Sequence, residues 1–228
     1  MRQMVWMAAT VLASTMVLDA AVTRAQAERL HDAAMVLQEI HRAPDRDIPG
    51  GLWEKASCVA VFPSVKKAAF LVGGEFGKGV MSCRNGAMWS APSFMTLEKG
   101  SFGLQFGGES VDLVLLVMNE HGVNRLLQDK VSLGGEASIA GGPVGRDAGA
   151  MTDAQLKAEV LSYSRSQGLF AGFDLAGGVI KTDQHDNREL YDGQELSTRD
   201  ILLGRRASTP QAAAEFERAL KRTMPTVG

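Results

Sequence analysis

The spacing of apolar residues changes along the chain, from a helical period near the N-terminus to strands and then back to helices. Between Glu28 and Arg42, leucine, isoleucine and alanine recur every three or four positions among charged residues, which predicts an amphipathic helix. Pro44 follows the helix and ends it. A short helical turn holding Leu52 and Trp53 comes next. Beyond it the helical period is largely lost until the last third of the chain.

The middle of the chain predicts short strands separated by glycine and proline. Cys58 to Pro63 is an apolar run closed by proline, typical of a buried strand. Ala69 to Cys83 has the apolar content of two strands and contains four glycines, which predicts a hairpin or a sharply bent strand. Three or four further strands are expected in Ala87 to Asn119. Within them, Val111 to Met118 is unbroken valine, leucine and methionine apart from Asp112, so we expect burial on both faces.

The second half of the chain returns gradually to helix. Asn119 is expected to cap a short helix that runs to Gln128. The elements expected after it are strands at Val131 to Ala140, Lys157 to Ser164 and Gly168 to Lys181, and helices at Asp186 to Tyr191, Thr198 to Leu203 and Thr209 to Arg222, the last with Thr209 as N-cap and Pro210 at N1. Short, mostly antiparallel, glycine-rich strands between N- and C-terminal helices predict an α+β fold. No convincing boundary divides residues 28–228, so we expect one domain.

The first 27 residues have the pattern of a secretory signal peptide. Arg2 precedes an almost unbroken apolar run from Met4 to Leu18, and Ala25-Gln26-Ala27 fits the small-x-small cleavage rule. Cleavage after Ala27 would place the mature chain in the periplasm or outside the cell. An uncleaved membrane anchor is the alternative, although the run is shorter than the roughly 20 residues that a spanning helix needs.

Charge and cysteine content restrict the classes of partner. The leader contains two arginines and one aspartate, so its removal from 24 basic and 26 acidic residues leaves a net charge of −3. That net charge does not indicate the strongly basic surface that nucleic-acid binding requires. Cys58 and Cys83 would be able to pair in an oxidising compartment, and two buried free thiols are the alternative. Two cysteines without histidines nearby make a poor metal site.

The sequence contains no complete catalytic motif. GGEFGKG lacks the first glycine of a phosphate-binding loop and the hydroxyl residue after its lysine, and GGESVD lacks the second glycine of a nucleophile elbow. The four histidines do not have metal-ligand spacing. The only candidates for catalytic residues would be His185-Asp186 and Ser164. We therefore expect a protein without catalytic residues, metal or cofactor.

Several stretches together resemble the SYLF domain family, also called the Ysc84 actin-binding domain family. The resemblance extends from Ile48 to Gly204 and is carried by IPGGLWEKASCVAVFPSVKKAAFLVGGEFGKGVMSCR, WSAPSFMTL, SFGLQFGG, VDLVLLVMN, VSLGGEASIAGGPVGR and YSRSQGLFAGFDLAGG. It implies lipid binding, because the eukaryotic members are known for binding phosphoinositides and, in yeast, actin filaments. An exported chain would meet neither, so we expect an anionic lipid or membrane surface as partner and no actin binding. An adaptor that binds another envelope protein through its N-terminal helix is the alternative.

The residues that fit lipid binding are basic side chains beside apolar strands. Four of them would form one basic face if strands 58–62 and 80–83 pair. Arg165 is a further candidate, with hydrogen bonding to backbone at a strand end as its alternative role. Glycines interleaved with Phe170 and Phe173 would let acyl chains, or simply neighbouring strands, approach the backbone. The four residues of the basic face are Lys66, Lys67, Lys78 and Arg84.

Overall fold

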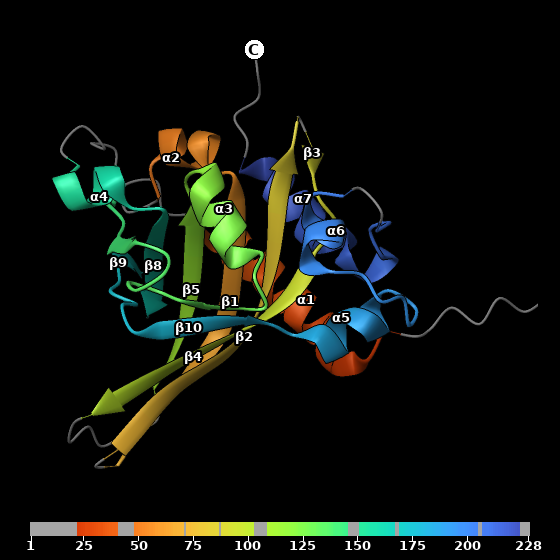
Figure 1. The fold of residues 1–228 in the computed structure, drawn as a ribbon, viewed down its shortest axis with the longest axis horizontal. Coiled ribbons are helices and arrows are strands. Elements are labelled where there is room, and N and C mark those ends of the chain that lie inside the picture. The colour runs from red at the N-terminus through yellow and green to blue at the C-terminus, as the bar shows by residue number, and fades with distance from the viewer. Residues whose placement is uncertain are drawn as a thin grey trace, which may run out of the picture.

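A single curled sheet forms the centre of the molecule, and helices lie around one end of it (Figure 1). The computed structural model describes residues 22–40, 48–70, 72–86, 88–102, 109–145, 151–166, 169–204 and 207–223. Its strands are β1 (Cys58–Phe70), β2 (Val72–Asn85), β3 (Met88–Trp89), β4 (Ser93–Phe102), β5 (Glu109–Val117), β6 (Lys130–Ser132), β7 (Ile139–Gly141), β8 (Val160–Ser166), β9 (Leu169–Gly172) and β10 (Gly178–Thr182). The expected α+β fold with mostly antiparallel strands is confirmed.

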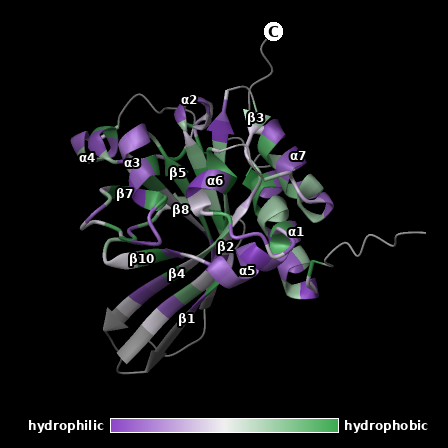
Figure 2. Cartoon of the chain, turned by 45° about the vertical axis from the view of Figure 1, so that its right-hand side comes forward, coloured by the Kyte–Doolittle hydropathy of each residue, from purple (hydrophilic) through white to green (hydrophobic). Residues whose placement is uncertain are grey.

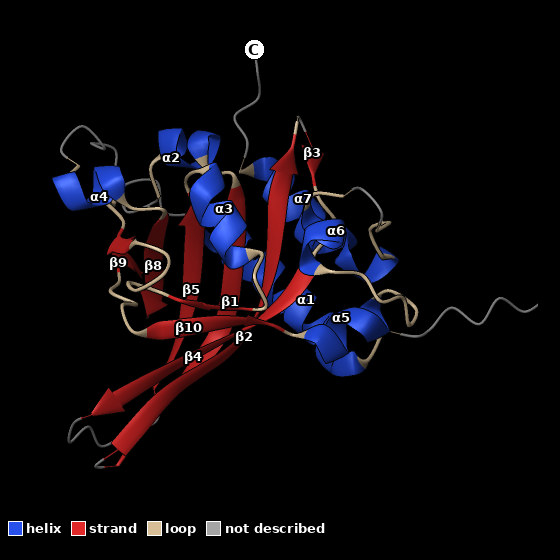
Figure 3. Ribbon diagram, viewed as in Figure 1, coloured by secondary structure: helices blue, strands red, loops and turns tan. Residues whose placement is uncertain are grey.

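The helices precede, interrupt and follow the strands, as Figure 3 shows. They are α1 (Arg24–Ile40), α2 (Gly50–Lys55), α3 (Glu120–Leu126), α4 (Asp153–Lys157), α5 (Gln184–Leu190), α6 (Thr198–Leu202), the 3-10 turn η2 (Gln211–Ala213) and α7 (Ala214–Arg222). No helix within the described ranges is both long and apolar enough to cross a membrane.

Strand β1 lies at the middle of the sheet, between β2 and β5. The described strands follow the order β6-β10-β4-β2-β1-β5-β8-β7, with β3 added to β2 and β9 added to β8. Every neighbouring pair is antiparallel except β7 with β8. From Leu113 to Val117, β5 is completely buried, which confirms the expected strand that is covered on both faces. Figure 2 shows the hydrophobic segments gathered where the helices meet the sheet.

Helix α1 buries its apolar stripe in the core of its own domain. Leu30, Ala33, Ala34, Leu37 and Ile40 are essentially inaccessible to solvent, and α1 packs against α7 and the first two strands. The helix begins four residues earlier than the pattern predicts. It therefore includes Ala25 to Ala27, where the buried Gln26 donates a hydrogen bond to the carboxylate of Glu189 (2.7 Å). Residues 1–21 lie outside the described residues.

Three expected elements have different boundaries because glycine turns were misplaced. The hairpin or bent strand expected over 69–83 is divided between the end of β1 and the antiparallel strand β2, and all four of its glycines lie within β2. The expected strand from 131 to 140 is divided into β6 and β7 by a turn in which Gly134 has φ +83°. The expected strand from 168 to 181 is divided into β9 and β10 by a turn in which Gly177 has φ +81°. Only glycine adopts such backbone angles without a steric cost.

Two element starts also differ from the prediction. Thr152 caps α4 with a reciprocal bond to Gln155, so residues 153–157 are helical and β8 begins only at Val160. At the C-terminus, Pro210 rather than Thr209 is the N-cap, and it precedes the η2 turn without a side-chain capping bond. The first difference comes from a local capping interaction, which apolar periodicity does not report.

Candidate functional site

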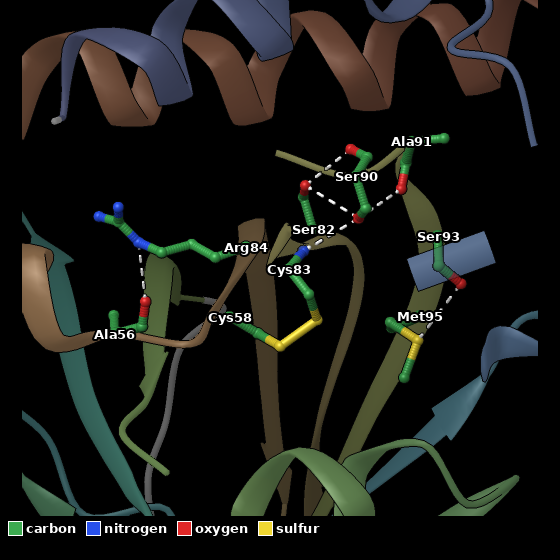
Figure 4. Close-up of a disulfide and its surroundings, with 9 residues drawn as sticks. All are labelled: Ala56, Cys58, Ser82, Cys83, Arg84, Ser90, Ala91, Ser93 and Met95. Atoms are coloured by element: carbon green, nitrogen blue, oxygen red, sulfur yellow. Dashed lines mark hydrogen bonds between the residues drawn. A yellow bond between two sulfur atoms is a disulfide. The ribbon is translucent and has the colours of Figure 1, made fainter. Parts of the chain in front are cut away.

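At one end of the sheet, Cys58 and Cys83 lie directly opposite each other on β1 and β2 and form a disulfide (Figure 4). Of the two alternatives for the cysteines, the structure contains the bonded pair. The Ser90 hydroxyl accepts a hydrogen bond from the Cys83 amide at 3.0 Å. This end of the β1–β2 pair is therefore fixed by a covalent bond and by a neighbouring strand end.

Arg84, a predicted lipid-binding residue, is part of the structure at this same end. Its guanidinium donates to the carbonyl oxygens of Ala56 (3.0 Å) and Trp53 (2.8 Å) and lies 4.9 Å from the centroid of the Trp89 ring. Burial lowers the pKa of Arg84, although the nearby Glu54 charge opposes this effect. Arg84 thus joins α2 to the sheet. A pocket of about 410 Å³ lies beside it, and six of its eleven lining residues are polar or charged.

Lys78 is engaged in a network of charged groups between the sheet and two helices. Its ammonium lies 3.1 Å from the Asp186 carboxylate and 3.6 Å from that of Asp183. Arg29 of α1 pairs with both aspartates and lies 4.4 Å from the Phe94 ring centroid. Burial alone would raise the pKa of Asp186. Hydrogen bonding with Asp183 and Lys78 and the charge of Arg29 outweigh burial, so its pKa lies well below the ordinary value.

Arg165 joins three parts of the chain through carboxylates. On β8, it pairs with Asp112 of β5 at 3.0 Å and with Glu39 of α1. Asp112 also accepts the backbone N–H of Ser64 at 2.9 Å, in the bulge of β1. The expected roles of this residue were lipid binding or a hydrogen bond to backbone at a strand end. Its partners in the structure are two acidic side chains.

The expected basic face of Lys66, Lys67, Lys78 and Arg84 is divided by the register of the sheet. Strands β1 and β2 pair as the hypothesis required, and Arg84 then lies beside Ser57, whose carbonyl accepts its N–H at 2.7 Å. Lys66 is nine residues farther along β1, about 30 Å at roughly 3.3 Å per residue. Arg84 and the two consecutive lysines therefore lie at opposite ends of the sheet.

Among the candidate cations whose side chains are described, Lys66 is exposed and makes no ion pair with a described side chain, whereas the half-exposed Lys78 is paired with Asp183 and Asp186. Lys66 lies in register with Phe76 of β2, whose side chain is 47% exposed. The next residue, Lys67, is paired along the backbone with Glu75 and Glu109, and its side chain lies outside the described residues.

The glycines near Phe170 and Phe173 accommodate protein backbone. A Cβ atom on Gly172 would lie 2.5 Å from the Gly142 carbonyl oxygen. Strand β9 ends at this glycine, so residues 169–175 do not form one extended apolar face. Phe173 is partly buried against the core and lies 5.7 Å from the Lys99 ammonium. The side chain of Phe170 lies outside the described residues.

The residues offered for catalysis are not brought together. His185 and Asp186 lie on α5 beside β2, whereas Ser164 lies on β8, and β1 and β5 separate those two strands. His185, Asp186 and Glu189 place ligand atoms within 4.8 Å of one another. Asp186 in this group is already paired with Arg29 and Lys78, so the cluster is a hydrogen-bonded part of the charged network.

Glu159 is a buried carboxylate that was not among the expected site residues. Ser138 donates to it from its backbone N–H (2.6 Å) and its hydroxyl (3.1 Å), and His121 bonds its other oxygen. Burial favours the protonated form of Glu159, but these hydrogen bonds outweigh it and lower its pKa. The carboxylate joins α3 to the start of β8. Its partners are 21 and 38 residues away, so no local spacing could have revealed it.

Comparison with known proteins gives the family of the chain. The model of the Ysc84 family, described as Las17-binding protein actin regulator, matches residues 98–223. SH3 domain-containing YSC84-like protein 1 of Xenopus laevis is 34% identical over 75% of this chain and 53% of its own length, and the Homo sapiens protein of that name is 33% identical over 81% and 56%. Protein YSC84 of Saccharomyces cerevisiae is 34% identical over 78% of this chain and 38% of its own length. The chain spans only about half, or less, of these relatives, and it belongs to the Ysc84 family.

Proposed function

We propose that this chain is a non-enzymatic domain that binds a phospholipid membrane surface in the bacterial cell envelope. Membership of the Ysc84 family supports a binding role, and the resemblance to SYLF domains implies lipid as the ligand. The matching family model is named for Las17 binding and actin regulation. We do not extend that role to this chain, because residues 1–27 predict export.

The observation that carries the proposal is the exposed pair of Lys66 and Phe76. A cation beside an exposed aromatic side chain suits the boundary between phosphate head groups and acyl chains, where each lysine near an anionic surface contributes about 1 kcal/mol. Arg84, Arg165 and Lys78 are bound to carbonyl or carboxylate groups of the protein itself. Lys66 is held by no comparable contact among the described side chains.

A surface contact fits the described residues better than an enclosed lipid does. The pocket near the disulfide has six polar or charged residues among its eleven lining residues, and a second pocket, of about 230 Å³ between Asp129 and Leu196, has nine polar residues among ten. An acyl chain needs an apolar lining, because leaving polar groups without hydrogen-bond partners is costly. The adaptor alternative gains no support, since the stripe of α1 is buried.

Vesicle co-sedimentation of the full chain tests the proposal. We expect binding to vesicles that contain phosphatidylglycerol, and at least about a tenfold loss at low salt for Lys66→Glu/Lys67→Glu, because two favourable charges are reversed. Lys130→Glu/Lys157→Glu makes the same charge change at two exposed lysines elsewhere and is the matched control. Failure of the unaltered chain to bind any vesicle would contradict the proposed function. Equal losses for the two double variants would contradict the role of Lys66 and Lys67.

A further inference from the structure

Three strands extend beyond the helices and form an arm (Figure 1, lower left). We define the β-arm as residues 66–70 of β1, 72–76 of β2 and 98–102 of β4. These strands remain paired to their ends, with Phe70 opposite Val72 and Val72 opposite Phe102. The neighbouring strands stop earlier: the last pairing of β10 with β4 is at Lys99, and the last of β5 with β1 is at Lys67. Within the described ranges, the outer part of the β-arm is therefore three strands wide.

The alternation of strand residues divides the β-arm into two faces. Residues two apart on a strand, and residues opposite each other on neighbouring strands, share a face. The first face has Lys66, Phe76 and Glu98 in one row, Ala68, Gly74 and Gly100 in the next, and Phe70, Val72 and Phe102 in the outermost. The second face begins with the row Lys67, Glu75 and Lys99 and continues with Ala69, Gly73 and Ser101.

The helices cover the first face only up to Lys78. That residue contacts Asp186 of α5, whereas Phe76, two positions farther out on the same face, is 47% exposed. The second face is contacted at its base by the loop after β9, because Lys99 donates to the Asp174 carbonyl at 2.9 Å. At Phe76 and Gly100, which are exposed, the first face therefore lies beyond the helix layer.

A sharp boundary between charged and uncharged positions crosses all three strands at one height. The charged rows of both faces lie side by side, and no residue of the β-arm beyond them carries a charge. Phe70 lies three residues beyond Lys67, about 10 Å at roughly 3.3 Å per residue. This length is close to the 5–10 Å by which interfacial elements enter a bilayer.

We propose that the β-arm inserts its uncharged end into the bilayer, with the first face turned toward the acyl chains and the charged rows at the head groups. This inference rests on the proposed membrane function and names the element that performs it. A planar boundary across three strands matches a planar head-group layer. A protein groove would not require charged positions to end at one height.

The charge of the β-arm also indicates which lipids it accepts. Its three lysines, Lys66, Lys67 and Lys99, are accompanied by Glu75 and Glu98, and the latter is paired with Lys181 at 2.5 Å. The net charge is small, so insertion depends mainly on apolar contact. Anionic lipid should improve binding about fivefold through Lys66, and a fraction of the binding should persist at high salt.

A fluorescent label at the end of the β-arm tests insertion directly. In the full chain both native cysteines are in the disulfide, so Val72→Cys provides a single site for an environment-sensitive dye. Leu156→Cys, on α4, is the matched control, because Leu156 is an apolar residue that is 65% exposed outside the β-arm. With phosphatidylcholine vesicles and with vesicles containing phosphatidylglycerol, we expect a blue-shifted emission, quenched by spin-labelled lipid, only at position 72.

A second pair of variants measures the contribution of the first face. Phe76→Ser should reduce vesicle binding several-fold, including the salt-resistant fraction, whereas Leu156→Ser should not change it. Thermal melting of each variant confirms that it is folded.

Vesicle binding with no change in the dye at position 72 would overturn the insertion and leave the proposed function standing. Absence of vesicle binding would overturn both, and a dimer in light scattering with no lipid response would show that the β-arm contacts a second copy.

Discussion

Strands β1, β2 and β4 have different environments at their two ends. At the disulfide end, the helices cover the sheet, Arg84 is bonded to backbone carbonyls, and the charged network joins α1 and α5 to Lys78. In the β-arm the same strands pass beyond the helices, and the exposed Phe76 marks where coverage ends. Continuous backbone pairing thus extends farther than the core does. We call the disulfide end, where helices lie over the sheet, the covered end. Substitutions there should change stability, whereas those in the β-arm should change membrane binding.

The largest loss of stability is expected from Arg29→Ala. The substitution leaves the mostly buried carboxylates of Asp183 and Asp186 without their main partner, and breaking a buried pair from one side costs about 3–5 kcal/mol. Urea denaturation measures it. Arg188→Ala removes an exposed pair with Glu195 and should cost less than about 0.5 kcal/mol. Similar losses for both variants would show that the network does not stabilise the covered end.

Removal of the disulfide is expected to be the next most damaging change. The two cysteines are 25 residues apart, and closing a loop of that size lowers the entropy of the unfolded chain by an amount equivalent to about 3 kcal/mol. Cys58→Ala/Cys83→Ala should lose that much free energy of unfolding. A reducing agent should lower the stability of the unaltered protein but not of the double variant. Equal sensitivity of the two proteins to the reductant would contradict this.

Strand β2 has one glycine in each region, Gly79 at the covered end and Gly74 in the β-arm, so the two regions can be compared within one strand. A Cβ atom at Gly79 would lie 2.4 Å from Cδ1 of Phe62 and 2.6 Å from the Val61 carbonyl oxygen, whereas at Gly74 its nearest contact would be the Lys99 carbonyl at 3.6 Å. Gly79→Ala should therefore cost about 1–3 kcal/mol through overpacking. Gly74→Ala should be close to neutral. A larger cost at Gly74 in thermal melting would mean that the β-arm is packed as tightly as the covered end.

The smallest expected effect is the contribution of Asp186 to the dependence of stability on pH. Its pKa is lower in the folded state than in the unfolded chain, so the unfolded chain binds the proton first as pH falls. The stabilisation is present above the ordinary pKa of about 3.9 and is lost below it, with a slope of at most about 1.4 kcal/mol per pH unit. Asp186→Asn should reduce that slope between about pH 5 and pH 2. Asp32→Asn, on the exposed side of α1, is the control.

Sequence patterns were informative wherever one local signal decided the structure. The apolar stripe of α1, the unbroken strand β5 and the Asn119 cap of α3 each follow from residues that are near one another in the chain. The turns at Gly134 and Gly177 were missed, because a glycine in a strand and a glycine in a turn look alike without backbone angles. The resemblance identified the family, which the comparisons then confirmed.

The candidate site was predicted less well than the fold, since a charged residue does not reveal its partner. Arg84 and Arg165 are residues of a type that ligand-binding sites often contain, but in this structure both bind other parts of the protein. The partners of Arg84 are 28 and 31 residues away along the chain, and Asp112, a partner of Arg165, is 53 residues away. Lys66 is exposed, and its proposed role in lipid binding remains a prediction. Its register with Phe76 could not be read from the sequence, because pairing depends on where the hairpin turns.

Patterns along the chain predicted most of the helices and strands and the places where uncharged residues accumulate. Hydrophobic periodicity and capping residues act over a few positions and are therefore visible in a single chain. Which cations bind other parts of the protein, and the height at which the charged rows of β1, β2 and β4 align, follow from tertiary contacts. Those outcomes depend on strand register and helix coverage, which arise from contacts between residues far apart in the chain. The same lysines and phenylalanines would form a different surface if the register shifted by one residue.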